Sequence, residues 1–161
     1  MFNIDNWHKR IYKDDLVYVL INAFAVVLLG GIIAGSIDYL FSLIKVNISF
    51  GLIIITLILG IRIRKSYYNF HILYPVLSIP FMILAIFIST LTEWVYLFGI
   101  QNFCNILLDP AFYLNFVEQP VYYIVKAFNP FDGLVLVLGI VDTLIYIWSF
   151  YFCYRLAKGN N

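Results

Sequence analysis

Residues 16–44 read LVYVLINAFAVVLLGGIIAGSIDYLFSLI, an apolar stretch that only Asn22 and Asp38 interrupt. A helix that crosses a bilayer needs about 20 mostly apolar residues, because lipid offers no hydrogen-bond partner to free backbone N–H and C=O groups. The stretch is long enough to form one such helix. It therefore predicts a membrane span.

The composition of the whole chain agrees with this prediction. The 161 residues are 63% hydrophobic and 12% charged, whereas an ordinary soluble domain is about 45–50% apolar and about 25% charged. The same figures exclude a disordered chain, a collagen-like repeat, a coiled coil and a secreted disulfide scaffold. The net charge of +1 and the lack of a basic patch with interleaved aromatic residues exclude a nucleic-acid partner.

Three further stretches meet or approach the length of a span, at about 46–61, 72–100 and 134–154. The second is short, but Arg62 and Arg64 can extend their aliphatic stems along the bilayer core and reach the interface; a re-entrant hairpin is the alternative. The predicted fold is an all-α integral membrane four-helix bundle, with residues 1–161 as a single domain.

The basic residues predict the orientation of the bundle. Four spans place both termini on one side, and eight of the ten Lys and Arg residues fall on that side, with only Lys45 and Lys126 opposite. By the positive-inside rule, both termini are cytoplasmic and the chain lies in the cell membrane, as in a bacterial inner membrane. Cleavage of the first span as a signal peptide is disfavoured, because its leader carries Asp5, Asp14 and Asp15.

The external segment 101–130 is too long for a tight turn and too apolar for a free loop. Polar–proline pairs at 109–110, 119–120 and 129–130 predict two short helices, at about 110–118 and 120–128, with Asn129 capping the entry to the fourth span. Their aromatic residues are expected at the depth of the lipid headgroups. The segment is interpreted as an interfacial lid, with a docking surface or gate as the alternative.

Small and polar residues follow one face of three of the spans. Gly31 and Gly35 form a GxxxG pattern in the first span, and Gly139 begins a similar stripe in the fourth. Such residues mark helix contacts in membranes, since lipid provides no hydrophobic drive between helices. The first, third and fourth spans are expected to pack through these stripes, and the second to face lipid or a partner.

Acidic residues within the spans give the candidate site. Asp38 and Glu93 are each expected near the external boundary, whereas Asp142 lies about 15 Å into the fourth span, near the middle of the bilayer. An ionised carboxylate there costs about 2.5–3.5 kcal/mol, so Asp142 is either protonated or compensated by a water-filled cavity or a partner subunit. The functional hypothesis is a cation- or proton-responsive polar site open to the exterior, formed by Asp142, Asp38, Glu93 and Ser89; the alternative is a structural hydrogen bond from Asp142 to a serine or threonine.

Catalytic and cofactor motifs are missing from the sequence. It contains no G-x-S-x-G, HExxH, Walker A or GxGxxG pattern. Cys104 and Cys153 have neither CxxC spacing nor a plausible set of fellow metal ligands. No catalytic, cofactor-binding or metal-binding residue is therefore expected, and the protein is expected not to be an enzyme.

The layout resembles small bacterial four-span membrane proteins of unknown function. The resemblance rests on the glycine-rich first helix, the basic turn at 62–65, Glu93-Trp94 at the end of the third span and Leu108-Asp109-Pro110. Pore-forming colicin immunity proteins are also similar in having four spans, cytoplasmic termini and a basic central turn, but their larger external loop lies between the first two spans.

These features predict a non-enzymatic accessory or assembly-forming membrane subunit that forms homo-oligomers or binds another membrane protein within the lipid bilayer. One alternative is a small transporter or channel protomer with an outward-facing acidic site. Another is an immunity or defence protein that binds an invading protein in the membrane.

Overall fold

A computed structural model describes residues 11–44, 49–113 and 133–159. These residues are 88% helical and include no strand, which confirms the all-α fold class. The helices are α1 (Lys13–Leu43), α2 (Phe50–Lys65), α3 (Leu73–Phe98), η2 (Ile100–Asn102), α4 (Phe103–Leu108) and α6 (Gly133–Lys158).

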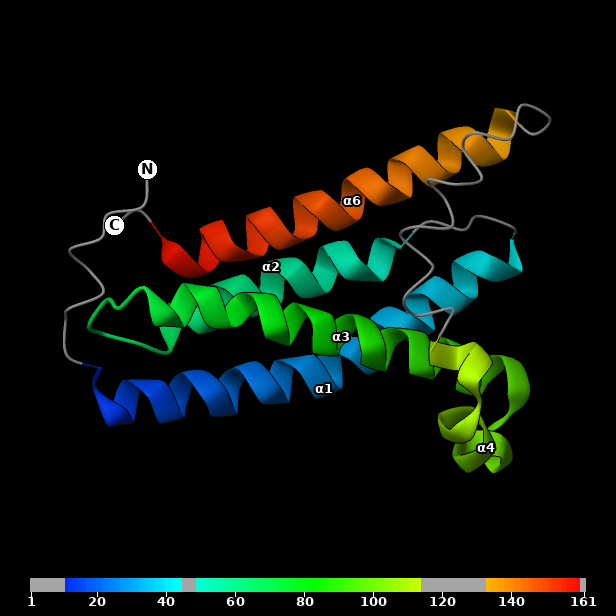
Figure 1. The fold of residues 1–161 in the computed structure, drawn as a ribbon. Helices are drawn as coiled ribbons and strands as arrows, with labels where there is room; N and C mark the ends of the chain where they lie inside the picture. The colour runs from blue at the N-terminus through cyan, green and yellow to red at the C-terminus, as the bar shows by residue number, and fades with distance from the viewer. Residues whose placement is uncertain (1–10, 45–48, 114–132, 160–161) are drawn as a thin grey trace.

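The four long helices lie side by side along one bundle, and α2 occupies a central place in it (Figure 1). It packs against α1 and α6 and, less extensively, against α3, while α1 and α6 make no comparable contact within the described ranges. The prediction that the bundle packs through the other three helices, with the second apolar stretch outside their contacts, is therefore wrong, although one side of α2, with Ile54, Ile58 and Ile61, remains exposed. Gly51, Thr56 and Gly60 are buried at the contacts of α2; because the helix is apolar on every side, its sequence pattern did not reveal a buried face.

The first helix begins and the last helix ends at the same end of the bundle. The Tyr67 hydroxyl, between α2 and α3, donates to the carbonyl oxygen of Ala157 at 2.6 Å, and the Tyr74 hydroxyl donates to that of Tyr12 at 3.4 Å. The rings of Tyr67 and Tyr74 lie 5.0 Å apart. Asp15 of α1 also accepts a hydrogen bond from the Asn69 backbone N–H at 3.1 Å. The turn between α2 and α3 thus joins the start of α1 to the end of α6.

A core of aliphatic side chains runs along the axis of the bundle. It includes Val19 and Val27 of α1, Leu59 of α2 and Met82 of α3, all fully buried. On α6, Cys153 faces this core and is also fully buried. Exposed Cys104 lies in α4, so the two cysteines occupy different environments.

The segment after α3 differs in part from the predicted pair of short helices. Residues 110–113 are helical, but the remainder of the predicted helices at 110–118 and 120–128, and the predicted cap Asn129, lie outside the described residues. Ahead of them, η2 and α4 form a helical elbow that the sequence reading did not predict. Phe112 anchors the elbow, since it is fully buried and its ring lies 5.3 Å from that of Trp94.

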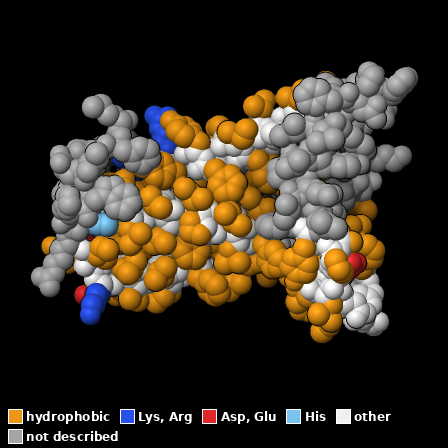
Figure 2. All heavy atoms as spheres, in the orientation of Figure 1, with side chains coloured by type: hydrophobic (Ala, Val, Ile, Leu, Met, Phe, Trp, Pro, Cys, Tyr) orange, Lys and Arg blue, Asp and Glu red, His pale blue; other side chains and the backbone are white. Residues whose placement is uncertain are grey.

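Much of the bundle surface is apolar. The face in Figure 2 is covered mainly by hydrophobic side chains, and Lys and Arg appear on it only at one end. Two helices, α1 and α3, are long and apolar enough to cross a membrane by length and composition. Among the described residues, the large apolar side chains that remain exposed include Leu29 at 67% and Ile147 at 63%.

Candidate functional site

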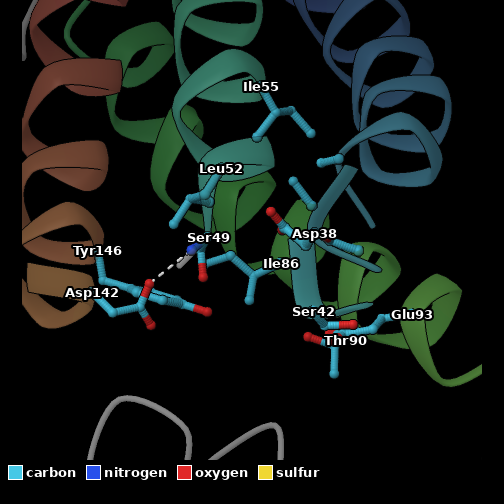
Figure 3. A pocket seen from close by; sticks show the side chains of 13 residues that line it. Asp38, Ser42, Ser49, Leu52, Ile55, Ile86, Thr90, Glu93, Asp142 and Tyr146 are labelled. Atoms are coloured by element: carbon cyan, nitrogen blue, oxygen red, sulfur yellow. Dashed lines mark hydrogen bonds between the residues drawn. The ribbon is translucent and has the colours of Figure 1, made fainter. Parts of the chain in front are cut away.

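A polar cavity of about 160 Å³ lies where α2 begins, at the end of the bundle opposite the Tyr67 turn. Three carboxylates from three different helices line it: Asp38 of α1, Glu93 of α3 and Asp142 of α6 (Figure 3). The rest of its lining consists of hydroxyl groups and apolar side chains: Ala34, Ser42, Ser49, Leu52, Ile55, Ala85, Ile86, Ser89, Thr90 and Tyr146.

Two of the carboxylates bind the backbone at the start of α2. Asp142 Oδ1 accepts a hydrogen bond from the Ser49 N–H at 2.9 Å, and Asp38 Oδ1 accepts one from the Gly51 N–H at 2.8 Å. The first amides of a helix have no partner within the helix and carry its positive dipole end. Asp38 and Asp142 therefore cap α2 from two neighbouring helices, and the amides stabilise their negative charge in return.

Hydroxyl groups extend this polar network. The Ser89 hydroxyl lies near the Asp38 carboxylate, and the Ser49 hydroxyl lies near that of Asp142. On α3, Glu93 follows Ser89 by one helical turn and faces the same cavity. The cavity thus combines carboxylates with groups that can accept or donate a hydrogen bond, a combination suited to protons and small cations.

Small residues bring the helices close enough to form this cavity. An added Cβ at Gly51 would lie 2.5 Å from Cα and from the carbonyl oxygen of Ala34, and one at Gly35 would clash with the carbonyl oxygen of Ser89. At Gly31, an added Cβ would lie 2.8 Å from Cγ2 of Ile88. Gly31 and Gly35 therefore set the contact of α1 with α3, and Gly51 sets that of α1 with α2.

The described basic residues all lie at the end of the bundle opposite the cavity. No Lys or Arg is among the residues that line the cavity, and the six described basic residues stand at the opposite end, in the first turn of α1 or near the ends of α2 and α6. They are Lys13, Arg62, Arg64, Lys65, Arg155 and Lys158. Of the described His, Cys, Asp and Glu residues, no three form a group that could hold a metal ion.

The candidate residues Asp38, Glu93, Asp142 and Ser89 all line the one cavity. The prediction that Asp142 lies deeper than the other two acids is wrong, because Asp142 is level with the first turn of α2. The physical reason is how the helices are shifted along one another: α2, with 16 residues, begins well inside the length of α1, with 31, and of α6, with 26. The longer helices extend past the start of α2 (Figure 1). Asp142 therefore lies well inside α6 and still meets the first turn of α2.

Two residues of the site, Ser49 and Tyr146, were not predicted from the sequence, and the packing of a third candidate, Gly139, is not described. Gly139 belongs to α6, but its packing lies outside the described residues. Ser49 was not proposed as a site residue, although a serine just ahead of an apolar run is a typical start signal for a helix. Tyr146, one turn after Asp142, also lines the cavity and was not proposed as a site residue.

No protein-family model, no curated protein and no solved structure matches this chain. The site is therefore interpreted from its own geometry and chemistry.

Proposed function

We propose that this chain is a multi-pass membrane protein of four spans that takes up protons or monovalent cations from the outer side of the membrane into the cavity at the start of α2. One observation carries the proposal: three carboxylates, Asp38, Glu93 and Asp142, converge from three helices on a cavity with no Lys or Arg in its described lining. Ionisable residues within membrane segments are expensive and mark ion pathways and proton relays by default.

The surface of the bundle supports membrane insertion. Each of the four long helices exposes large aliphatic side chains, for example Ile33 (56%) on α1, Ile58 (44%) on α2, Ile83 (48%) on α3 and Leu144 (59%) on α6. Contiguous exposed apolar area on this scale favours lipid over water as the surrounding solvent. At 16 residues, α2 spans about 24 Å, and its terminal Arg62, Arg64 and Lys65 can reach the interface by extending their stems.

The placement of the described basic residues supports an outward-facing cavity. The described Lys and Arg residues gather at the end where α1 begins and α6 ends. The positive-inside rule places that end, and hence both termini, in the cytoplasm. The acidic cavity then opens toward the other side, where it can take up cations from the exterior.

The capping of α2 couples cation uptake to the position of that helix. A carboxylate that gains a proton loses most of its attraction for the helix amides and for the positive end of the dipole. Protonation of Asp38 or Asp142 therefore loosens the start of α2, whereas a monovalent cation that enters the cavity and leaves both carboxylates ionised would leave both caps in place. The two kinds of ion are thus distinguishable by their effect on α2.

The proposal is tested with purified protein in lipid vesicles that enclose either a pH-sensitive or a sodium-sensitive dye, driven by a potassium diffusion potential, with and without a sodium gradient. The wild type should carry protons or sodium faster than protein-free vesicles. The variants Asp142→Asn and Glu93→Gln should reduce the flux to the protein-free level, while the control Asp14→Asn, an exposed carboxylate at the other end, should leave it unchanged. Absence of wild-type flux, or full flux in both cavity variants, would refute the proposal.

A second candidate is the non-enzymatic accessory or assembly-forming subunit, in which another copy or another membrane protein covers the outer face of α6. Ile140, Leu144, Ile147 and Tyr151 recur at helical spacing on this face, and each is at least 47% exposed. Gly31 and Gly35 do not support such an assembly, because they are occupied by the contact of α1 with α3. Oxidative cross-linking of Cys104→Ser/Ile147→Cys in membranes, with Cys104→Ser/Ile58→Cys on α2 as the control, should give dimers only for α6 if this second function holds.

A further inference from the structure

A second hollow lies on the outside of the bundle, between α2 and α6. It has a volume of about 370 Å³ and is lined by Ile53 of α2 and by Val141, Leu144, Ile145 and Trp148 of α6. All five side chains are apolar, and Trp148 is 40% exposed. We name these five residues the seam groove. Its lining offers nothing to a polar ligand and suits a hydrocarbon chain.

The groove leads along α6 to basic residues. The indole of Trp148 stacks on the ring of Phe152 one turn further on, with ring centroids 4.6 Å apart and an interplanar angle of 15°. Arg155 follows Trp148 by seven residues, or two turns, so it lies on the same side of the helix. It is exposed and stands about 10 Å beyond Trp148 along the axis.

The partner helix brings a second set of basic residues to the same place. An added Cβ at Gly60 of α2 would lie 2.6 Å from Cβ of Leu156, so α2 and α6 touch there. One turn later the Arg64 guanidinium lies 5.0 Å from the centre of the Tyr67 ring, and its side chain contacts Gly159 at the end of α6. Both helices therefore end in basic side chains where their last carbonyl groups give a partial negative charge.

We propose that this seam binds one anionic phospholipid, with an acyl chain in the seam groove and the phosphate on Arg155, Lys158 and Arg64. The groove extends from about 10 Å (Trp148) to about 21 Å (Val141) from Arg155 along α6, a range that overlaps the roughly 15 Å depth of one hydrocarbon leaflet. Arg binds phosphate through paired, charge-assisted hydrogen bonds. Basic pockets between helices on the cytoplasmic side are suited to anionic headgroups.

Of the described carboxylates at this end of the bundle, Asp14 and Asp15 belong to α1, and Asp15 is bound to the Asn69 N–H. Neither belongs to α2 or α6, the helices that form the seam, and Arg155 of the seam is exposed. The inference rests on the membrane insertion in the proposed function, but not on cation uptake by the acidic cavity.

The fluorescence of Trp148, which lines the seam groove, reports on a lipid chain bound there. Replacing the other two tryptophans, in the variant Trp7→Phe/Trp94→Phe, leaves it as the sole indole fluorophore. This protein is placed in bilayers of phosphatidylcholine and phosphatidylglycerol in which one or the other lipid carries brominated chains that quench indole fluorescence. Brominated phosphatidylglycerol should quench Trp148 with an apparent affinity about fivefold higher than brominated phosphatidylcholine.

The added substitutions Arg155→Gln/Lys158→Gln should remove this preference. The matched control Arg62→Gln should preserve it, because Arg62 lies two residues from Gly60 and so on the other side of α2. Equal quenching by the two lipids would overturn the proposal, as would a preference that survives Arg155→Gln/Lys158→Gln. Lack of quenching by either lipid would show that protein covers the groove and would overturn it too. Flotation of the vesicles checks membrane insertion separately, so failure of the proposed function is told apart from failure of the lipid site.

Discussion

Gly51 stands where the first turn of α2 crosses α1, and its replacement tests how the acidic cavity is built. In Gly51→Ala the new Cβ would lie 2.5 Å from Cα and from the carbonyl oxygen of Ala34, and 2.7 Å from its carbonyl carbon, whereas ordinary contacts begin at 3.4 Å. All three atoms are backbone, so no side-chain rotation relieves the overlap. The start of α2 must move away from α1 by about 1 Å if the contact is to become ordinary.

Such a movement has two energetic consequences. Overpacking of a well-packed contact costs about 1–3 kcal/mol, and the 2.8 Å hydrogen bond from the Gly51 N–H to Asp38 is weakened, at a further cost of up to about 1.5–3 kcal/mol for a bond to a charged group. The higher helix propensity of alanine offsets at most about 1 kcal/mol of this loss in stability. We expect a net loss of about 2–4 kcal/mol in the free energy of unfolding.

Gly30→Ala is the matched control. Its new Cβ would lie 3.1 Å from Cδ1 and Cγ1 of Ile55 and 3.9 Å from Cγ1 of Val26. All are side-chain atoms, so Ile55 needs to shift by only a few tenths of an ångström. Gly30→Ala should therefore leave stability unchanged or raise it by up to about 1 kcal/mol. Both variants are compared with the wild type by reversible denaturation in detergent micelles, followed by circular dichroism. The reasoning is refuted if Gly51→Ala is as stable as the wild type, or if Gly30→Ala is equally damaging.

Three further variants test other parts of the structure. Ser149→Ala should raise the free energy of unfolding by about 1 kcal/mol in the same denaturation assay, because the fully buried Ser149 hydroxyl has no hydrogen-bond partner among the described residues; a loss of stability would contradict this. Burial raises the pKa of Tyr67 from 10.0 to about 12. The neutral Tyr67 phenol therefore stabilises the fold fully below pH 10, and this stabilisation is lost as the pH rises through about 12. Tyr67→Phe should therefore start with a lower Tm at neutral pH, having lost the bond to Ala157, but should fall less than the wild type between pH 10 and pH 12; parallel curves would contradict the assignment. Phe112→Ala should free the α4 elbow, with a loss of up to about 3–5 kcal/mol and faster proteolysis between α3 and α6, since the Phe112 ring packs on Trp94 and Phe87; unchanged proteolysis would show that the elbow is held by other contacts.

The bounds of α1 and α3 could be predicted closely from the sequence, because long runs of apolar residues between polar segments are strong signals. The bounds of α2 were predicted less well, since the expected stretch was 46–61 and the helix is Phe50–Lys65, and α6 ends at Lys158 instead of 154. The first stretch was expected at 16–44 and the helix is Lys13–Leu43; the third was expected at 72–100 and the helix is Leu73–Phe98. The central place of α2 could not be predicted. Its packing depends on Gly51 and Gly60, whose role follows from close approach in space and not from the hydrophobic pattern.

The membership of the candidate site could be predicted in large part, but its geometry could not. Unpaired carboxylates in apolar stretches are few, so Asp38, Glu93 and Asp142 stood out. Their convergence depends on the start of α2 lying between α1 and α6, which sets Asp142 against Ser49. Helix length alone does not determine how far one helix is shifted along its neighbours, and the depth assigned to Asp142 was therefore wrong.

Thiol labelling of the cavity in intact cells tests most directly whether it is acidic and faces outward. Ser42, which lines the cavity, is replaced in the variant Cys104→Ser/Ser42→Cys and treated from outside with a membrane-impermeant cationic or anionic methanethiosulfonate; Cys104→Ser/Ile100→Cys, at a 76% exposed position outside the cavity lining, gives the reference ratio of the two rates. We predict a cationic-to-anionic rate ratio at least about tenfold above that reference, falling toward it when Asp142→Asn is added. Equal ratios at the two positions, or labelling of Ser42→Cys only after the cells are opened, would contradict an outward-facing acidic cavity.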